Sequence, residues 1–494
     1  MHKDTFYFQS LKLLFVIALN VALARFTSGY SCIIIVIVGV YYAFANKPGV
    51  AICSYLLLPL MLVVSPQIVP KTGVIWSAIL RCGTLMIALS LCLGAAKRRG
   101  NNRLPFAGIL PFLGVACISS ATGWVPIISY LKIINYLVFL LGLWFGTQNL
   151  QERPKDVFLI RAMMFALCIF IIVGSIAVLP FPTISYATSV RYLIAKGEFD
   201  LVAAHNAMAA AGGTTLFCGI TNHSQWLAPI NALMLGWLLC DMMFVEKRVR
   251  WPHLSLIVLS FPILYMTRSR VAFVTGGVAI VVIYFYTMRR VRIDNAIRSH
   301  MKHIMFALIC FVFIGGVIAE LRSDAITRWL RKATEGELQT DTRTLSEAIT
   351  ASRQGLLEES LYEYRRNKLF GSGFQVSWVH PIMLQEGTIS YFSAPIEKGV
   401  LPVMVLGETG IVGSIFFVIF LISFYSTCIS RRLYVTISMF TMLLASNMGE
   451  ATFFAPGGHG SFVWIFSIVG GFIVDTVVLY PYCGLANNRS QRLI

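Results

Sequence analysis

Runs of about 20 apolar residues, the length that a helix needs to cross the hydrocarbon core of a bilayer, recur along nearly the whole chain. They extend from near residue 11 to residue 480. Of the 494 residues, 57% are hydrophobic and only 13% are charged, whereas a typical soluble domain carries about 25% charge. This excludes an ordinary soluble enzyme, and the high hydrophobicity excludes a disordered chain. The sequence therefore predicts an all-α polytopic membrane protein.

Because several of the apolar runs are short, we expect twelve to fourteen transmembrane helices. The candidate spans are 11–26, 30–46, 48–65, 74–95, 105–120, 124–147, 157–180, 223–243, 252–266, 271–288, 303–320, 400–425, 434–447 and 461–480. The first run has no small-residue cleavage signature, so we interpret it as a retained span. The 11 cysteines show no CxxC pair and no ligand-like spacing, so we expect neither a disulfide framework nor a metal site.

Basic residues gather in every second loop. The chain has 40 Lys+Arg against 22 Asp+Glu, a formal net charge of +18. Positive charge concentrates in the short cytoplasmic loops of polytopic proteins, so the alternation predicts that both termini are cytoplasmic. We therefore attribute the net positive charge to membrane topology, and we expect no nucleic-acid partner.

Two predicted extracytoplasmic segments are long, at 181–222 and 320–399. They divide the chain into N-terminal helices (1–180), a first long periplasmic segment (181–222), central helices (223–319), a large loop (320–399) and C-terminal helices (400–494). The large loop is nearly neutral. Within it, 347–368 is predicted to form an amphipathic helix, because Arg353, Leu357, Leu361 and Arg365 recur at four-residue spacing along one face. Gly371 and Gly373 end this helix.

Two arginines in a very short outer turn are the most unexpected charges. Arg268 and Arg270 lie in Met266-Thr267-Arg268-Ser269-Arg270, on the side where positive charge is disfavoured. Planar guanidinium groups bind phosphate oxygens in a bidentate manner, so the turn indicates an anionic partner. The alternative is that both side chains extend to lipid headgroups.

Further candidate residues lie in three polar clusters. Each has a structural alternative. For the first it is a helix cap by Thr221 or Asn222, with His223 facing water. For the second it is a solvated helix face, and for Glu408 it is an ion pair or the cap of a broken helix at Gly407 and Gly410. The clusters are Asn222, His223 and Gln225 before a span; Arg353, Arg365, Arg366 and Lys368 in the large loop, followed by His380; and Glu397 and Glu408 at the start of the next span.

In these segments the chain resembles the O-antigen ligase/O-antigen polymerase superfamily of bacterial membrane glycosyltransferases. The similar segments are Gly219-Ile220-Thr221-Asn222-His223-Ser224-Gln225, then Thr267-Arg268-Ser269-Arg270-Val271-Ala272, then Gly371-Ser372-Gly373-Phe374 and Gly407-Glu408-Thr409-Gly410-Ile411-Val412-Gly413. Their order and spacing match over roughly residues 200–450, while the N-terminal spans match only in being apolar.

The resemblance implies a function. Members transfer a glycan from undecaprenyl diphosphate to an acceptor glycan or glycolipid at the periplasmic face of the inner membrane, without metal or cofactor. Arg268, Arg270, Arg353 and Arg365 would then bind the diphosphate. Asn222, His223, Gln225 and Glu408 would line the substrate cavity. Membrane lipids, a flippase and a chain-length regulator are the further partners that it implies.

One position departs from the family pattern. Members usually carry a His-Asn pair shortly before the Glu-x-Gly element, where this chain has Glu397-Lys398-Gly399. The role of the missing His therefore passes to Glu397 or to the more distant His380, or it is not needed. The departure favours a polymerase of O-antigen or exopolysaccharide repeats over a ligase that acts on lipid A core. A lipid-linked oligosaccharide transporter and a membrane scaffold protein remain the alternatives from other classes.

Overall fold

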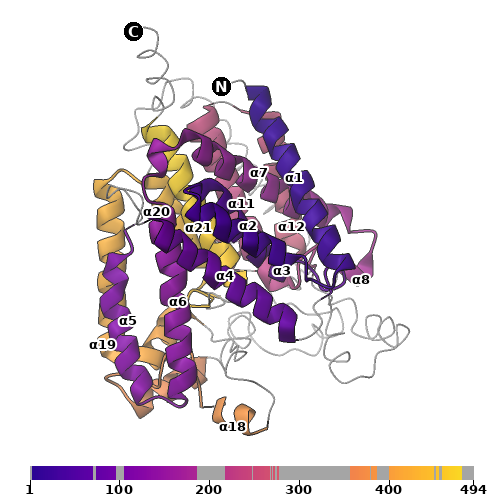
Figure 1. Ribbon diagram of the computed structural model, residues 1–494. Helices are drawn as coiled ribbons and strands as arrows, with labels where there is room; N and C mark the ends of the chain where they lie inside the picture. The colour runs from indigo at the N-terminus through magenta and orange to yellow at the C-terminus, as the bar shows by residue number, and fades with distance from the viewer. Residues whose placement is uncertain are drawn as a thin grey trace, which may run out of the picture. The chain divides into compact units, whose positions relative to one another are not determined.

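A computed structural model describes most of the chain (Figure 1). The described residues are 3–70, 74–95, 105–185, 217–247, 249–267, 269, 271–272, 275–277, 357–378, 380–386, 400–449, 452–455 and 459–480. Within these ranges every regular element is a helix, and one isolated antiparallel bridge joins Val64 and Thr221. The predicted all-α class is confirmed for the part of the chain that is described.

The helices follow the predicted apolar runs closely. They are α1 (Lys3–Phe26), α2 (Cys32–Phe44), α3 (Pro48–Val63), α4 (Val74–Ala95), η1 (Ala107–Ile109), α5 (Leu110–Ala121), α6 (Pro126–Gly146), η2 (Leu150–Glu152), α7 (Pro154–Ala177), α8 (Pro182–Ser185), α11 (Ser224–Cys240), the π-helical η3 (Asp241–Glu246), α12 (Trp251–Met266), an unlabelled helix at 357–366, α18 (His380–Gln385), α19 (Leu401–Ser430), α20 (Tyr434–Ser446) and α21 (His459–Leu479).

Six of the described helices are long and apolar enough to cross a membrane, and six more are apolar but shorter. The long ones are Thr5–Phe26, Pro126–Glu152, Pro154–Ala177, Ser224–Glu246, Leu401–Ser430 and Gly460–Leu479. The protein is therefore polytopic. Together these twelve helices coincide with twelve of the fourteen predicted spans. Of the two remaining predicted spans, 303–320 lies outside the described residues and 271–288 lies almost entirely outside them.

The chain divides into two compact units. The first comprises 1–63, 69–167 and 355–494, and the second comprises 64–68 and 168–354. In the first unit α4 packs on α6, α2 on α3 and α4, α20 on α21, and α5 on α19; in the second, α11 packs on α12. Small residues permit this close packing: a Cβ on Gly142 of α6 would come within 2.6 Å of the Ala88 side chain on α4.

Aromatic side chains fill the centre of the first unit. Phe112 stacks on Phe454 at 5.3 Å between ring centroids, and Phe374 meets the same ring edge-on at 5.2 Å. Trp464 lies beside this group and donates its indole N–H to the Phe453 carbonyl at 2.6 Å. Because Phe374 belongs to the large loop, this core fixes part of that loop against the transmembrane helices.

Contacts within the first unit join loops that the charge pattern assigns to the same side. The turn at 45–47 meets the turn at 147–153, where Arg153 donates to the Asn46 carbonyl at 2.6 Å. The turn at 122–125 meets the large loop, where Trp124 N–H donates to the Ser372 carbonyl at 3.2 Å. The packing is thus consistent with the predicted alternation, and the direction in which the chain faces rests on the charge pattern.

The predicted loop helix is present at 357–366, and residues 347–356 lie outside the described part. Its buried positions are Ser360 and Glu363, whereas Leu361 and Arg365 are exposed. Ser360 lies against α19, because a Cβ on Gly407 would come within 2.6 Å of the Ser360 carbonyl oxygen. The helix therefore packs through its small and acidic residues, which leaves the predicted leucine and arginine face toward the outside.

Candidate functional site

Helix α19 is broken near its start. Gly410 has φ 66° and ψ −166°, a conformation far from helical and open essentially to glycine alone. A break frees backbone carbonyls on one side and N–H groups on the other, and each group left unpaired in a membrane interior costs several kcal/mol. The groups around Gly410 must therefore find partners elsewhere.

A segment of the large loop supplies those partners. Before the break, the Gly407 carbonyl accepts from Ser372 N–H at 3.0 Å, and the Glu408 carbonyl accepts from Gly373 N–H at 3.1 Å. Gly371 lies close against the same stretch of α19, since a Cβ added to it would collide with the Glu408 backbone.

The same segment also closes the far side of the break. Ile411 N–H donates to the Lys368 carbonyl at 2.9 Å, and Val412 N–H donates to the Leu369 carbonyl at 3.2 Å. Residues 368–373 thus bind both sides of the gap through main-chain hydrogen bonds. We call this arrangement, residues 368–374 bound to 407–412, the α19 junction.

Three serines of α5 and α6 complete the α19 junction. Ser119 donates to the Glu408 carbonyl at 2.5 Å and accepts from Gly373 N–H at 3.1 Å. Ser129 donates to the Phe374 carbonyl at 2.6 Å and is 2.7 Å from the Ser120 hydroxyl. All three serines are fully buried. They add buried hydroxyl partners to the backbone groups at which helix and loop meet.

Two acidic residues are buried at the α19 junction. Glu408 is 1% exposed, and its backbone carbonyl takes part in the bonds that close the break. Glu363 is also 1% exposed and lies one helical turn after Ser360, which contacts Gly407. An acidic residue inside a membrane protein is costly and is usually functional. The predicted residue Glu408 therefore lies at the most irregular point of the first unit.

Basic side chains flank the α19 junction on the α5–α6 turn. The Arg366 guanidinium carbon lies 3.5 Å from the centre of the Trp124 ring, a close cation–π contact. Lys132 donates to the Gln375 carbonyl at 2.7 Å. The Arg366 side chain is thereby oriented by an aromatic face. Both Arg366 and the adjacent predicted residue Arg365 are exposed.

His380 begins the short helix α18 and is fully buried. Its Nδ1 accepts a hydrogen bond from Ser377 N–H at 2.9 Å. In a neutral imidazole only one nitrogen can accept, so the hydrogen lies on Nε2. In this state His380 presents a hydrogen-bond donor from Nε2.

The polar turn before α11 belongs to the second unit. His223 is the N-cap of α11, and its Nδ1 accepts from Gln225 N–H at 3.1 Å. The Thr221 hydroxyl donates to the Cys218 carbonyl at 2.8 Å. Asn222 is buried, and within the described residues its side-chain oxygen has no hydrogen-bond partner. The cap is therefore His223 and not Thr221 or Asn222, because the His223 Nδ1 reaches the Gln225 N–H, and the turn also holds a buried polar amide.

Four predicted site residues lie outside the described residues: Arg268, Arg270, Arg353 and Glu397. In the first unit, Glu408 lies in the α19 junction, Arg365 is on the adjoining loop helix, and His380 follows the junction in the chain. In the second unit, Asn222, His223 and Gln225 form one turn. Among the described residues, no three His, Cys, Asp or Glu side chains are grouped closely enough to hold a metal ion.

The sequence interpretation missed Trp124 and the three serines. Trp124 is a single aromatic residue in a short turn, and serine inside an apolar run is common, so neither carries a local pattern. The bond of Lys132 to the Gln375 carbonyl likewise depends on a contact across 243 residues, which no local pattern predicts.

Comparison of the chain with models of protein families, with curated proteins and with solved structures finds no match. The resemblance to the ligase/polymerase superfamily therefore rests on the quoted residues.

Proposed function

We propose that this protein is a glycosyltransferase that polymerises undecaprenyl-diphosphate-linked glycan repeats at the outer face of the bacterial inner membrane. The observation that supports this best is the α19 junction. There a polar loop segment enters the break of a transmembrane helix beside the buried Glu408. Irregular backbone at membrane depth is tolerated only where protein or a cavity covers it, so such a break is a plausible functional element.

The reaction needs a base and a means to stabilise the leaving group. The acceptor hydroxyl loses its proton to a carboxylate and its oxygen attacks the anomeric carbon. The bond from that carbon to the diphosphate breaks, with inversion, and the diphosphate leaves with the bonding electron pair. By the resemblance, Arg268, Arg270, Arg353 and Arg365 stabilise its negative charge.

The hydrogen bond at His380 bears on the choice of base. Because its Nδ1 already accepts from Ser377 N–H, the remaining Nε2 donates and cannot take up a proton in that tautomer. This favours Glu397 over His380 as the base.

A lipid-linked oligosaccharide transporter is the second candidate, because broken transmembrane helices also form the substrate sites of many transporters. Purified protein in liposomes with the lipid-linked repeat separates the two functions. Polymerisation lengthens the glycan, whereas transport only changes the leaflet in which an unaltered repeat is found. Attachment of the glycan to added lipid A core would indicate a ligase instead.

Variants test the assignment of residues. We expect Arg268→Ala and Arg270→Ala to abolish chain extension, and Glu397→Gln to reduce turnover at least about 100-fold with little change in donor binding. Arg432→Ala, an exposed arginine in the α19–α20 turn, is the matched control and should extend glycans normally. Normal glycan length in both Arg268→Ala and Arg270→Ala would contradict the diphosphate assignment.

The proposal also requires the large loop to face outward. A cysteine introduced at Lys368 should react with an impermeant maleimide in spheroplasts, and one at Arg432 should react only after lysis. Both residues are exposed, so each is a suitable reporter. The reverse labelling pattern would place the loop in the cytoplasm and remove the outer-face function.

A further inference from the structure

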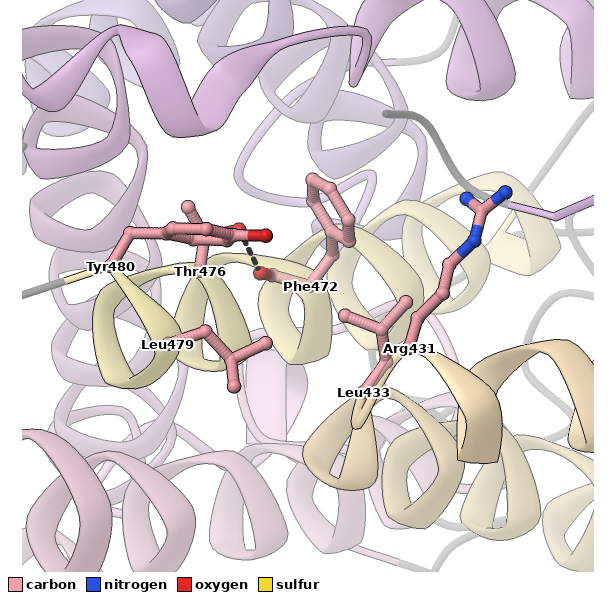
Figure 2. A pocket seen from close by; sticks show the side chains of 6 residues that line it. All are labelled: Arg431, Leu433, Phe472, Thr476, Leu479 and Tyr480. Atoms are coloured by element: carbon pink, nitrogen blue, oxygen red, sulfur yellow. Dashed lines mark hydrogen bonds between the residues drawn. The ribbon is translucent and has the colours of Figure 1, made fainter. Parts of the chain in front are cut away.

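A pocket of about 300 Å³ lies where α20 begins and α21 ends, at the opposite ends of these helices from the proposed active site. It is lined by Arg431, Leu433, Phe472, Thr476, Leu479 and Tyr480 (Figure 2). Its volume is at the lower end of the range for small-molecule sites, about 300–1,000 Å³. Nothing in the proposed reaction uses it.

The pocket has an apolar base and a polar rim. Leu433, Phe472 and Thr476 are buried, and the Thr476 hydroxyl is already used within its helix, donating to the Phe472 carbonyl at 2.7 Å. Arg431 and Tyr480 are exposed, and Figure 2 shows them on either side of Phe472. The pocket is therefore mainly apolar at its base and carries the positive charge of Arg431 at its rim.

The main chain holds Arg431 at this rim. Helix α19 ends in a Schellman motif, in which Leu433 N–H donates to the Cys428 carbonyl at 2.8 Å and Arg432 N–H donates to the Ile429 carbonyl at 3.1 Å. Arg432 takes the left-handed conformation of that motif, with φ 60°. Of the two adjacent arginines, only Arg431 lines the pocket.

A buried carboxylate fixes the wall opposite Arg431. Asp475 of α21 accepts from Val435 N–H at 3.0 Å, from Thr436 N–H at 2.8 Å and from the Thr436 hydroxyl at 2.7 Å. These bonds fasten the first turn of α20 to α21. They also engage the Asp475 carboxylate with α20, and the pocket lining itself contains no acidic residue.

We propose that this pocket binds an anionic phospholipid of the surrounding bilayer, with the phosphate at Arg431 and an acyl chain over Leu433, Phe472 and Leu479. Guanidinium groups bind phosphate oxygens well, and basic pockets between transmembrane helices bind anionic headgroups on the cytoplasmic side. The charge pattern assigns the α19–α20 turn to that side. Lipid binding here is independent of the proposed glycosyl transfer.

The test measures lipid retention by native mass spectrometry of the purified full-length protein. We expect dioleoyl-phosphatidylglycerol to be retained in preference to dioleoyl-phosphatidylcholine, which has the same chains. Arg431→Gln should weaken phosphatidylglycerol retention about tenfold or more, because a charge-assisted hydrogen bond is lost. Arg432→Gln is the matched control and should retain the lipid as the wild type does.

Three results would overturn the proposal. If Arg431→Gln and Arg432→Gln lost phosphatidylglycerol retention equally, the lipid would be responding only to the general surface charge or to the dipole of α19. Equal retention of the two lipids by the wild type would exclude recognition of an anionic headgroup. Full competition by glycerol phosphate would show a phosphate site without an acyl-chain contact. Leu479→Trp gives an independent check, since it should fill the apolar part and abolish retention while Arg431 remains.

Discussion

Two polar interruptions beside transmembrane helices, one in each unit, are closed in different ways. At the turn before α11 the helix cap is local, with Thr221 and His223 bonded to positions two or three residues away, while Ser65 and Ser175 bind the backbone of Ile220 just before it. The α19 junction is closed by a segment about 40 residues earlier and by serines more than 240 residues earlier. The first is a local cap, and the second exists only when distant parts of the chain have assembled.

This difference predicts that changes at the α19 junction are the more damaging. A local cap loses one hydrogen bond when it is altered. A change at a junction between three segments disturbs several hydrogen bonds. Water cannot replace them, because it does not reach the backbone groups that the break in α19 leaves unpaired. The following variants test that contrast in decreasing order of expected effect.

Gly410→Ala should cause the largest loss of stability. The left-handed φ of 66° costs a non-glycine residue, and the new Cβ would collide with the Leu369 carbonyl. We expect a loss of about 3 kcal/mol or more, measured as a lower thermal transition or as aggregation on size exclusion. Gly114→Ala is the control: it lies on α5 with no atom within 4 Å of the added Cβ, and it should be neutral or stabilising. Equal thermal transitions of the two variants would show that position 410 accepts a side chain without strain.

Ser119→Ala should cost about 1–2 kcal/mol, because the Glu408 carbonyl and the Gly373 N–H each lose one buried hydrogen bond but stay bonded to each other. Its thermal transition is compared with that of Ser430→Ala, an exposed serine bonded only within its own turn. The control should change stability by less than about 0.5 kcal/mol. A Ser119→Ala protein as stable as Ser430→Ala would mean that the serine is dispensable to the junction.

His223→Ala should cost only about 1 kcal/mol, the usual value of a lost N-cap. His223→Asn keeps an oxygen that can cap α11 and should restore thermal stability. Chain extension in the two variants then separates cap from substrate contact. If Asn restores stability but not activity, the imidazole has a role beyond the cap; if it restores both, the cap is sufficient.

Arg366→Gln should give the smallest effect, about 0.5–1 kcal/mol, because it removes only the cation–π contact with Trp124. Arg365→Gln changes an exposed neighbour and should leave the thermal transition within about 0.5 kcal/mol. A larger loss of stability for Arg365→Gln than for Arg366→Gln would contradict the assignment of Arg366 as the arginine ordered at the junction.

The sequence was sufficient for the features that depend on neighbouring residues. Hydropathy located the twelve apolar helices. A cap in the polar turn before α11 could also be predicted, but the capping residue is His223 and not Thr221 or Asn222. Gly407 and Gly410 also suggested a broken helix, and the break is present at Gly410.

What could not be predicted is the identity of the groups that close that break. Ser119 and Ser129 look like any serine in an apolar run, and their role appears only when α5 and α6 lie against 372–374. The loop helix shows the same limit. Its four-residue pattern suggested a face containing Leu361 and Arg365, whereas packing on Gly407 selects the small residue Ser360.

The α19 junction has a consequence for biosynthesis. Each group that closes the break, from the serines of α5 and α6 to residues 368–374, is translated before the second half of α19. The segments that bind the break are therefore synthesised before the broken helix is complete. A circularly permuted chain that began with α19 would have to insert that helix before its acceptors existed.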